Sequence, residues 1–315
     1  MVVVLGCGLP ITFPGQGTPS PTPAPTAQPA ATPTPTPATP AMHGNLSAAE
    51  VAQLRQAVVD RINQHRASAA LPPVQLDDLA SRVSDAFCAK QMLEGTHGHF
   101  TTEGLKPYHR YGLAGGTDNN TENAAAMWCS SGTSCFDTSF ASVRQALLDM
   151  EDHFFNEQPP NDGHRRAILD PAHTHVGVGF AFSSQGLRMT EEFLNRYITM
   201  SGFPKYVSAT GSVSVSGKVD DPSTYSVYSI TVFYEVPVQR TVDEVNQIHS
   251  YGYPSDPSAR KDYFPGIHFV VQGDGSFTLN VPLFAGAPGY YTVVVWLAKA
   301  GQSPFTATDA VIVAQ

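Results

Sequence analysis

The 315-residue chain lacks the signatures of several protein classes. It has no Gly-x-Ser-x-Gly elbow and no His-Glu-x-x-His pair, so it carries neither a serine-hydrolase nor a zinc-protease motif. No Cys-x-x-Cys pair occurs, which argues against a cysteine-based zinc site. No segment after the N-terminus is apolar for long enough to span a bilayer. Its 18 Lys and Arg are outnumbered by 27 Asp and Glu and form no basic stripe, so we expect no nucleic-acid partner.

Charged side chains are also absent from the N-terminal region, since none occurs before Glu50. We interpret residues 1–14 as a truncated lipoprotein signal, because Val4-Leu5-Gly6-Cys7 resembles a bacterial lipobox in which the cysteine becomes the lipidated N-terminus. The basic segment is missing and the apolar run is short, and a start site further upstream would supply both. The alternative is an apolar terminus with a chance cysteine. Residues 15–44 are rich in Pro, Thr and Ala, which predicts a disordered, extended linker.

The other three cysteines divide into a candidate pair and a single residue. Cys129 and Cys135 bracket a short loop of Ser, Gly and Thr, and their spacing permits a disulfide in an oxidising compartment. Cys88 falls in a helical pattern, and we interpret it as a small buried apolar side chain.

Residues 45–204 show helices and strands in mixed order. Ser47-Ala-Ala-Glu50 is a capping-box pattern that predicts the start of a helix. Apolar residues at helical spacing predict a second helix after Asp77 and a third across Phe140–Phe154. Val176–Phe182 alternates large residues with Gly and Ala, which predicts a buried strand. We therefore predict the α+β class, with helices on both faces of a sheet in an α/β/α sandwich.

Residues 205–315 have the sequence pattern of an all-β domain. Short β-rich runs follow one another with Pro and Gly between them, and Asp274-Gly275 is a hairpin-type turn. We predict an immunoglobulin-like β-sandwich with one short helical insert at Val242–His249. The predicted strands are Ser212–Val219, Val227–Val236, Gly266–Val271, Ser276–Leu283, Tyr290–Leu297 and Ala310–Val313.

A carboxylate and an imidazole flank a tight Pro-Pro-Asn-Asp-Gly turn at Glu157 and His164. Glu157 continues the apolar face of the preceding helix, and a carboxylate in that position is costly to bury without a partner. His164 is the nearest candidate for that partner. The Glu191-Glu192 pair, in contrast, is interpreted as a solvated strand end or as a partner for Arg188 and Arg196.

Five segments, in order, resemble the CAP superfamily of cysteine-rich secretory, antigen 5 and pathogenesis-related proteins in its bacterial, SCP-like extracellular form. The resemblance covers roughly residues 50–200 and implies the family's three-layer fold. It also implies a central cleft with two His and two Glu, which carry over to His99, Glu122, Glu157 and His164. The matching segments are Ile62–Arg66 with Leu71–Pro73, His99–Gly104 with Pro107–Arg110, Glu122-Asn123, Gly163–Leu169 and Val176–Gly179.

The cleft residues admit three interpretations. His99 and His164, with Glu122 and Glu157 as further ligands, suit Zn²⁺ or another divalent cation. Without metal, the same residues form two hydrogen-bonded His–Glu pairs whose histidines titrate near neutrality. The third interpretation is a buried polar network that only fixes the fold.

Three functions follow from these interpretations. The first is an extracellular or cell-envelope protein, either secreted or lipid-anchored through Cys7, whose cleft binds a cation, small molecule or lipid. Its second domain binds a cell-surface partner or acts as a spacer. The second is a metal-dependent hydrolase of peptide or cell-envelope substrates, with Glu122 or Glu157 as general base. The third is a structural surface protein with a vestigial cleft. The resemblance favours binding, because the family shares a fold and secretion, and we assign no catalytic residue.

Overall fold

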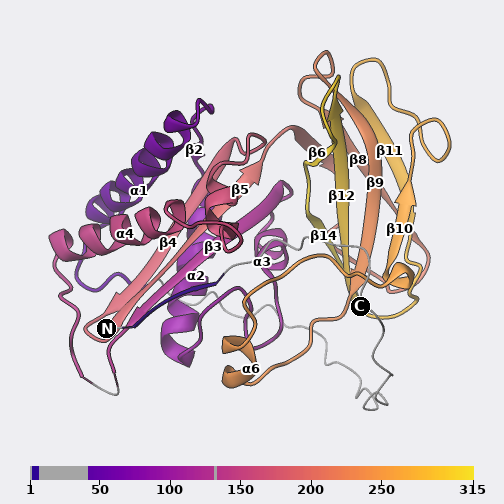
Figure 1. Cartoon of the computed structure of the whole chain (residues 1–315). Helices are drawn as coiled ribbons and strands as arrows, with labels where there is room; N and C mark the ends of the chain where they lie inside the picture. Colours follow the sequence, from indigo (N-terminus) through magenta and orange to yellow (C-terminus); the bar gives the residue numbers. More distant parts are fainter. Residues whose placement is uncertain (1, 7–41, 131–132) are drawn as a thin grey trace.

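The computed structural model describes residues 2–6, 42–130 and 133–315. Cys7 and most of the predicted linker lie outside these residues. The described part builds two sheet systems side by side, which we call the first domain (residues 2–6 and 42–195) and the second domain (residues 198–315) (Figure 1).

The first domain is centred on a five-stranded sheet in the order β1-β3-β5-β4-β2. β5 pairs antiparallel with both β3 and β4, while the short β2 runs parallel to β4. The strands are β1 (Val2–Gly6), β2 (Gln75–Leu76), β3 (Asn119–Trp128), β4 (His175–Ser183) and β5 (Gly186–Asn195). The helices are α1 (Ala48–Ser68), α2 (Asp78–Glu94), α3 (Pro107–Leu113), α4 (Phe140–Phe155) and α5 (Gly163–Ile168).

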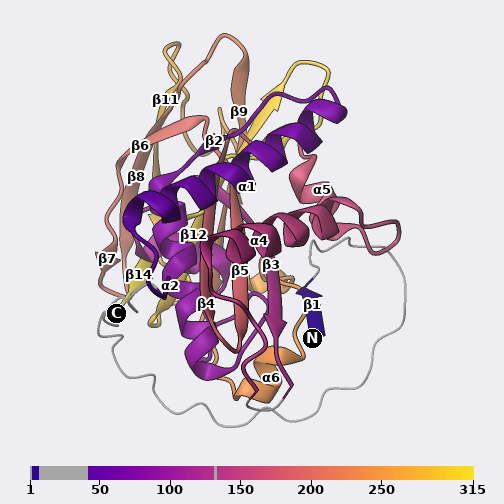
Figure 2. The same cartoon turned by 90° about the vertical axis from the view of Figure 1, so that its left-hand side faces the viewer.

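Helices cover both faces of this sheet. α1, α4 and α5 lie on one face, where their apolar side chains form the main core with the strands (Figure 2). α2 and α3 lie on the opposite face and make smaller apolar clusters with β4 and β5. The predicted caps are present, since Ser47 and Glu50 form a capping box and the Asp77 carboxylate accepts the Ala80 N–H at 2.7 Å. The predicted α/β/α layers are confirmed.

Two glycines allow α2 to lie close against β4. A Cβ atom at Gly177 would lie 2.3 Å from the Ala80 Cβ, and one at Gly179 would lie 2.2 Å from the Ser84 Cβ. Any side chain at either position would therefore push the helix away from the sheet. This contact explains why Gly alternates with large apolar residues in the strand.

The second domain consists of two sheets packed face to face around a shared apolar core. One sheet has the order β10-β9-β12-β14-β7 with β13 beside β12, and the other has the order β11-β8-β6. The strands are β6 (Ile198–Gly202), β7 (Tyr206–Val207), β8 (Ser212–Val219), β9 (Tyr225–Glu235), β10 (Arg260–Tyr263), β11 (Ser276–Pro282), β12 (Gly289–Lys299), β13 (Phe305–Thr306) and β14 (Ala310–Ala314). A strand-rich second region is confirmed, while its immunoglobulin-like topology stays a prediction.

Two details differ from expectation. The predicted strand Gly266–Val271 is wrong, because this segment holds turns and isolated bridges, and Arg260–Tyr263 pairs with β9 instead. The predicted boundary between residues 204 and 205 places β6 in the first domain, whereas β6 pairs with β8.

A long connection leads from β9 to the 3-10 helix at Pro257–Ala259. We call residues 236–256 of this connection the strap. It contains the short helix α6 (Val242–Asn246), which begins with a capping box at Thr241 and matches the predicted helical insert. In Figure 1 the strap leaves the sandwich and runs along the first domain.

Candidate functional site

His99 and Glu122 form a buried pair at the start of β3. The His99 Nδ1 lies 2.9 Å from the Glu122 Oε1, and both side chains are shielded from solvent. The other carboxylate oxygen, Oε2, accepts a hydrogen bond from Arg110, whose Nη1 also donates to the His99 carbonyl at 2.6 Å. Burial raises the pKa of Glu122 above its usual value, although Arg110 opposes the shift. Arg110 therefore compensates the buried charge and holds the histidine segment against β3.

Glu192 lies beside Glu122, because the two residues are direct partners in the β3–β5 pairing. Its carboxylate is 3.6 Å from Arg110, and the side chain is fully buried. Burial, followed by the charge of Glu122, holds the pKa of Glu192 well above its usual value. The interpretation of Glu191-Glu192 as a solvated strand end is wrong, because β5 is central and both sheet faces are covered.

His164 and Glu157 form the second predicted pair. Glu157 Oε1 lies 2.6 Å from the His164 Nδ1, and Oε2 accepts the backbone N–H of His164 at 3.0 Å. The expectation that Glu157 continues the helical face is wrong, because α4 ends at Phe155 and Glu157 lies in the following turn. From there both carboxylate oxygens turn back to His164 at the start of α5.

A buried polar network lies near His164, and the sequence did not predict it. The Asn123 side chain donates to the His164 carbonyl at 3.3 Å and to Glu191 at 3.2 Å. Burial, followed by the neighbouring Glu191, holds the pKa of Glu151 well above its usual value. His65 Nδ1 lies 2.9 Å from the Glu151 carboxylate and connects this network toward the surface. The sequence signal for this network is the Glu122-Asn123 pair. Neighbouring side chains on a strand point to opposite faces, so a buried Glu122 on one face places Asn123 on the other.

The strap of the second domain covers the His99 segment. The Tyr251 ring lies 4.9 Å from the His99 ring, and the Tyr251 hydroxyl accepts the Glu122 N–H at 2.7 Å. This N–H lies just beyond the end of the β1–β3 pairing, which stops at Ala124. The strap is also fixed by the Arg240 N–H, which donates to the Thr102 carbonyl at 2.7 Å. The second domain thus packs directly against the buried His99–Glu122 pair.

The two domains also share a buried polar contact at Asp309. Its carboxylate accepts hydrogen bonds from the Asn119 side chain at 2.9 Å and from the Asn120 N–H at 2.8 Å, and it also contacts the Tyr253 hydroxyl. Burial raises the pKa of Asp309 to about 7. The contact joins β3 to both the strap and the segment leading into β14.

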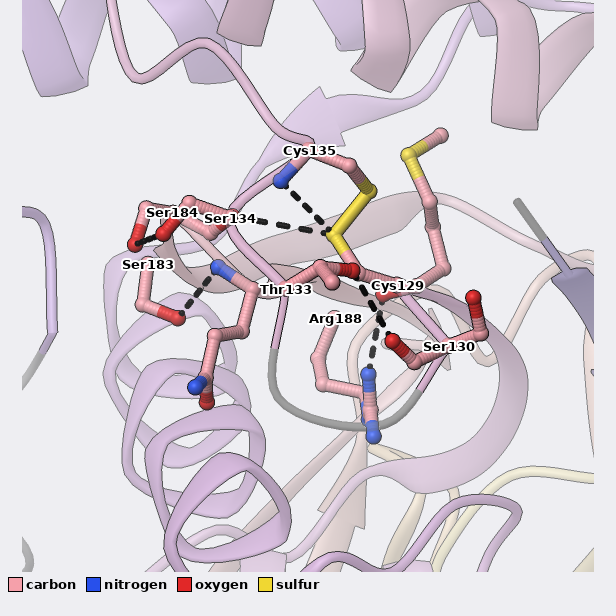
Figure 3. Close-up of a disulfide and its surroundings, with 10 residues drawn as sticks. Cys129, Ser130, Thr133, Ser134, Cys135, Ser183, Ser184 and Arg188 are labelled. Carbon is pink, nitrogen blue, oxygen red and sulfur yellow. Dashed lines mark hydrogen bonds between the residues drawn. A yellow bond between two sulfur atoms is a disulfide. The ribbon is translucent and has the colours of Figure 1, made fainter.

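Two cysteines lie at the other end of β3. Cys129 and Cys135 form a disulfide that closes the loop after this strand (Figure 3). Cys88 is a free, fully buried cysteine on α2, and burial raises the pKa of its thiol far above the usual range. The lipidation prediction at Cys7 falls outside the described residues.

The donor set does not fit a tightly held zinc centre. Structural zinc sites use four protein ligands and catalytic sites use three. Within residues 2–6, 42–130 and 133–315, no group of three or more His, Cys, Asp or Glu side chains could hold a metal ion. The Glu122 and Glu157 carboxylates are engaged by Arg110 and His164, so they orient the histidines instead of extending the ligand set.

Comparison with known proteins gives a match over the region that holds both His–Glu pairs. Residues 59–198 match the model of the cysteine-rich secretory protein family, CAP. This region is a CAP domain. A search among curated proteins found no match.

Solved structures similar to this chain include a bacterial extracellular protein and a bacterial outer surface protein. An extracellular protein containing an SCP domain from Bacillus anthracis is 20% identical over 49% of this chain, with a TM-score of 0.36. The chain spans 45% of the length of that protein. An outer surface protein from Borrelia burgdorferi is 16% identical over 47% of this chain and 94% of its own, with a TM-score of 0.34.

Proposed function

We propose that this chain is a non-hydrolytic binding module outside the cell, whose CAP domain binds an exchangeable divalent cation or a small hydrogen-bonding ligand through the imidazoles of His99 and His164. The observation that carries the proposal is the carboxylate on the Nδ1 of each imidazole. An ionised carboxylate only accepts hydrogen bonds, so Nδ1 is the protonated nitrogen and Nε2 carries the lone pair. Carboxylates orient metal-binding histidines in the same way.

The second function considered from the sequence, a metal-dependent hydrolase, is less well supported. A general base must reach a water molecule or substrate proton. Glu122 is buried with its two oxygens on His99 and Arg110, and both oxygens of Glu157 contact His164. Both carboxylates already accept hydrogen bonds from protein groups, which favours binding over hydrolysis.

Several features support a location outside the cell. The Cys129–Cys135 disulfide suits an oxidising compartment, and the family is described as secretory. Among the described helices, none has both the length and the apolar composition needed to cross a bilayer. Anchoring through a lipid on Cys7 stays a proposal from sequence, and the mass of the native N-terminus tests it: an unmodified Met1 would contradict it.

Titration of the metal-free full chain with Zn²⁺ tests the cleft. We expect wild type to bind about one ion per chain weakly, because two imidazoles are fewer ligands than a permanent site needs. His99→Ala/His164→Ala should lose this binding, and Glu157→Gln should weaken it about 10–100-fold by releasing the His164 ring. His153→Ala is the control, since this exposed histidine lies on α4 with its Nδ1 2.7 Å from the Asp149 carbonyl of the preceding turn.

The variants separate a specific site from surface binding. Equal zinc binding by wild type and by a folded double variant would contradict the proposed site. If the double variant fails to fold, Glu157→Gln decides the question, because its side chain lies at the rim of the buried region. An unchanged affinity in that variant would also contradict the proposal.

A further inference from the structure

A cavity of about 340 Å³ lies at the far end of β3, between the first domain and the strap. This volume falls in the range of small-molecule sites. The lining includes His97, Trp128, Gln185, Arg188 and Asn246, of which Asn246 belongs to α6 of the second domain. None of these residues takes part in the two His–Glu pairs.

Arg188 is the unusual member of this lining. It is only 6% exposed, and its Nε donates to the Thr96 carbonyl at 3.0 Å while Nη1 donates to the Met127 carbonyl at 3.2 Å. Figure 3 shows its side chain beside the Cys129–Cys135 disulfide. In the described part of the chain, no hydrogen bond of Nη2 and no ion pair of Arg188 is present.

This lack of a counter-ion can be checked over the whole sequence. No Asp or Glu precedes Glu50, and positions 131 and 132 are Ser and Gly, so every acidic side chain lies within the described residues. The earlier expectation that Glu191-Glu192 pairs with Arg188 is therefore wrong, while Arg196 pairs with Asp77 and Asp118. Burying a cation without a neighbouring anion costs free energy. An anionic ligand in the cavity would reduce that cost by pairing with Arg188.

The remaining walls fit an organic anion. The Arg188 guanidinium lies 5.6 Å from the centre of the Trp128 ring, and the His97 ring stacks on Trp128 at 5.5 Å. Desolvation, followed by the charge of Arg188, lowers the pKa of His97, so His97 adds no second positive charge at neutral pH. Burial lowers the pKa of Arg188 to about 10, which leaves the guanidinium charged.

Asn246 fixes the strap against this cavity. Its Oδ1 accepts the His97 N–H at 2.9 Å, and its Nδ2 donates to the Gly95 carbonyl at 3.2 Å. The second domain therefore supplies one wall of the cavity through Asn246. We propose that this interdomain cavity binds a small organic carboxylate, with its carboxylate on Arg188 and its apolar part against Trp128.

Tryptophan fluorescence gives a direct test with the full chain. The sequence has two tryptophans, Trp128 and Trp296, so Trp296→Phe leaves a single reporter inside the cavity. In that background we expect benzoate to change the fluorescence saturably. Benzyl alcohol, which has a similar shape but no charge, should bind at least about tenfold more weakly, because charged hydrogen bonds to Arg188 are lost.

Arg188→Gln should weaken benzoate binding by about tenfold or more, while Arg144→Gln, which removes one exposed charge on α4, should leave it unchanged. Equal binding of benzyl alcohol, or an unchanged affinity in a folded Arg188→Gln variant, would overturn the proposal. If Arg188→Gln does not fold, the comparison of benzoate with benzyl alcohol decides alone. Displacement of benzoate by an equal concentration of inorganic phosphate would overturn the assignment to an organic carboxylate.

Discussion

Replacing Arg110 with methionine is expected to lower the free energy of unfolding by about 3–5 kcal/mol at pH 8, because it leaves buried carboxylates without their cation. Arg110 is the shared partner of Glu122 and Glu192, and both carboxylates are shielded from solvent. Methionine keeps an apolar contact in place of the guanidinium on the Phe87 ring, which lies 3.5 Å away. The decrease in unfolding free energy should therefore reflect the lost charge compensation more than lost packing. Urea denaturation followed by circular dichroism measures it.

The pH dependence of this loss has a definite sign. The pKa values of Glu122 and Glu192 are already raised in the folded chain, and removing Arg110 raises them further. The folded variant then holds protons that the unfolded chain releases above pH 4 to 5, so its stability falls as the pH rises. The destabilisation should be smaller at pH 5 than at pH 8.

Two comparisons check the explanation. Arg110→Met/Glu192→Gln should recover part of the loss, because one of the two uncompensated carboxylates is gone. Arg144→Met on the exposed face of α4 should have almost no effect. A loss below about 1 kcal/mol for Arg110→Met, or one that does not depend on pH, would contradict the assigned role of Arg110.

Gly104→Ala is expected to destabilise the chain by about 2–4 kcal/mol, through strain and a clash between the domains. Gly104 has a φ of +83°, and a Cβ atom there would lie 2.2 Å from the Val238 carbonyl oxygen in the strap. Both contacting groups are backbone, so one of the two segments must move. We expect the strap to detach, and limited proteolysis within residues 236–256 measures this as faster cleavage.

Gly301 offers a matched control for the backbone strain. Its φ of +78° is nearly the same, but a Cβ atom there would meet nothing within 4 Å. Gly301→Ala should therefore cost only the strain and leave the strap protected from protease. Equal effects of the two substitutions would show that the strap is not held tightly at Gly104.

The sequence determined the local elements of this protein because their signals are local. Capping residues, the spacing of apolar side chains and the alternation in β4 predicted the helices and strands of the first domain. The Glu157–His164 pair was predictable for the same reason, since one turn joins the two residues. The His99–Glu122 pair was reached only through the family resemblance, because 22 residues separate them in the chain.

Tertiary structure decided the burial of charges and the role of the second domain. Glu191 and Glu192 look solvated in sequence, but β5 is the middle strand of a sheet that helices cover on both faces, so each carboxylate is buried on a different face. The contacts of Tyr251 with His99 and of Asn246 with the Arg188 cavity join residues about 60 to 150 positions apart. No local pattern encodes such contacts, because they depend on how the two domains meet.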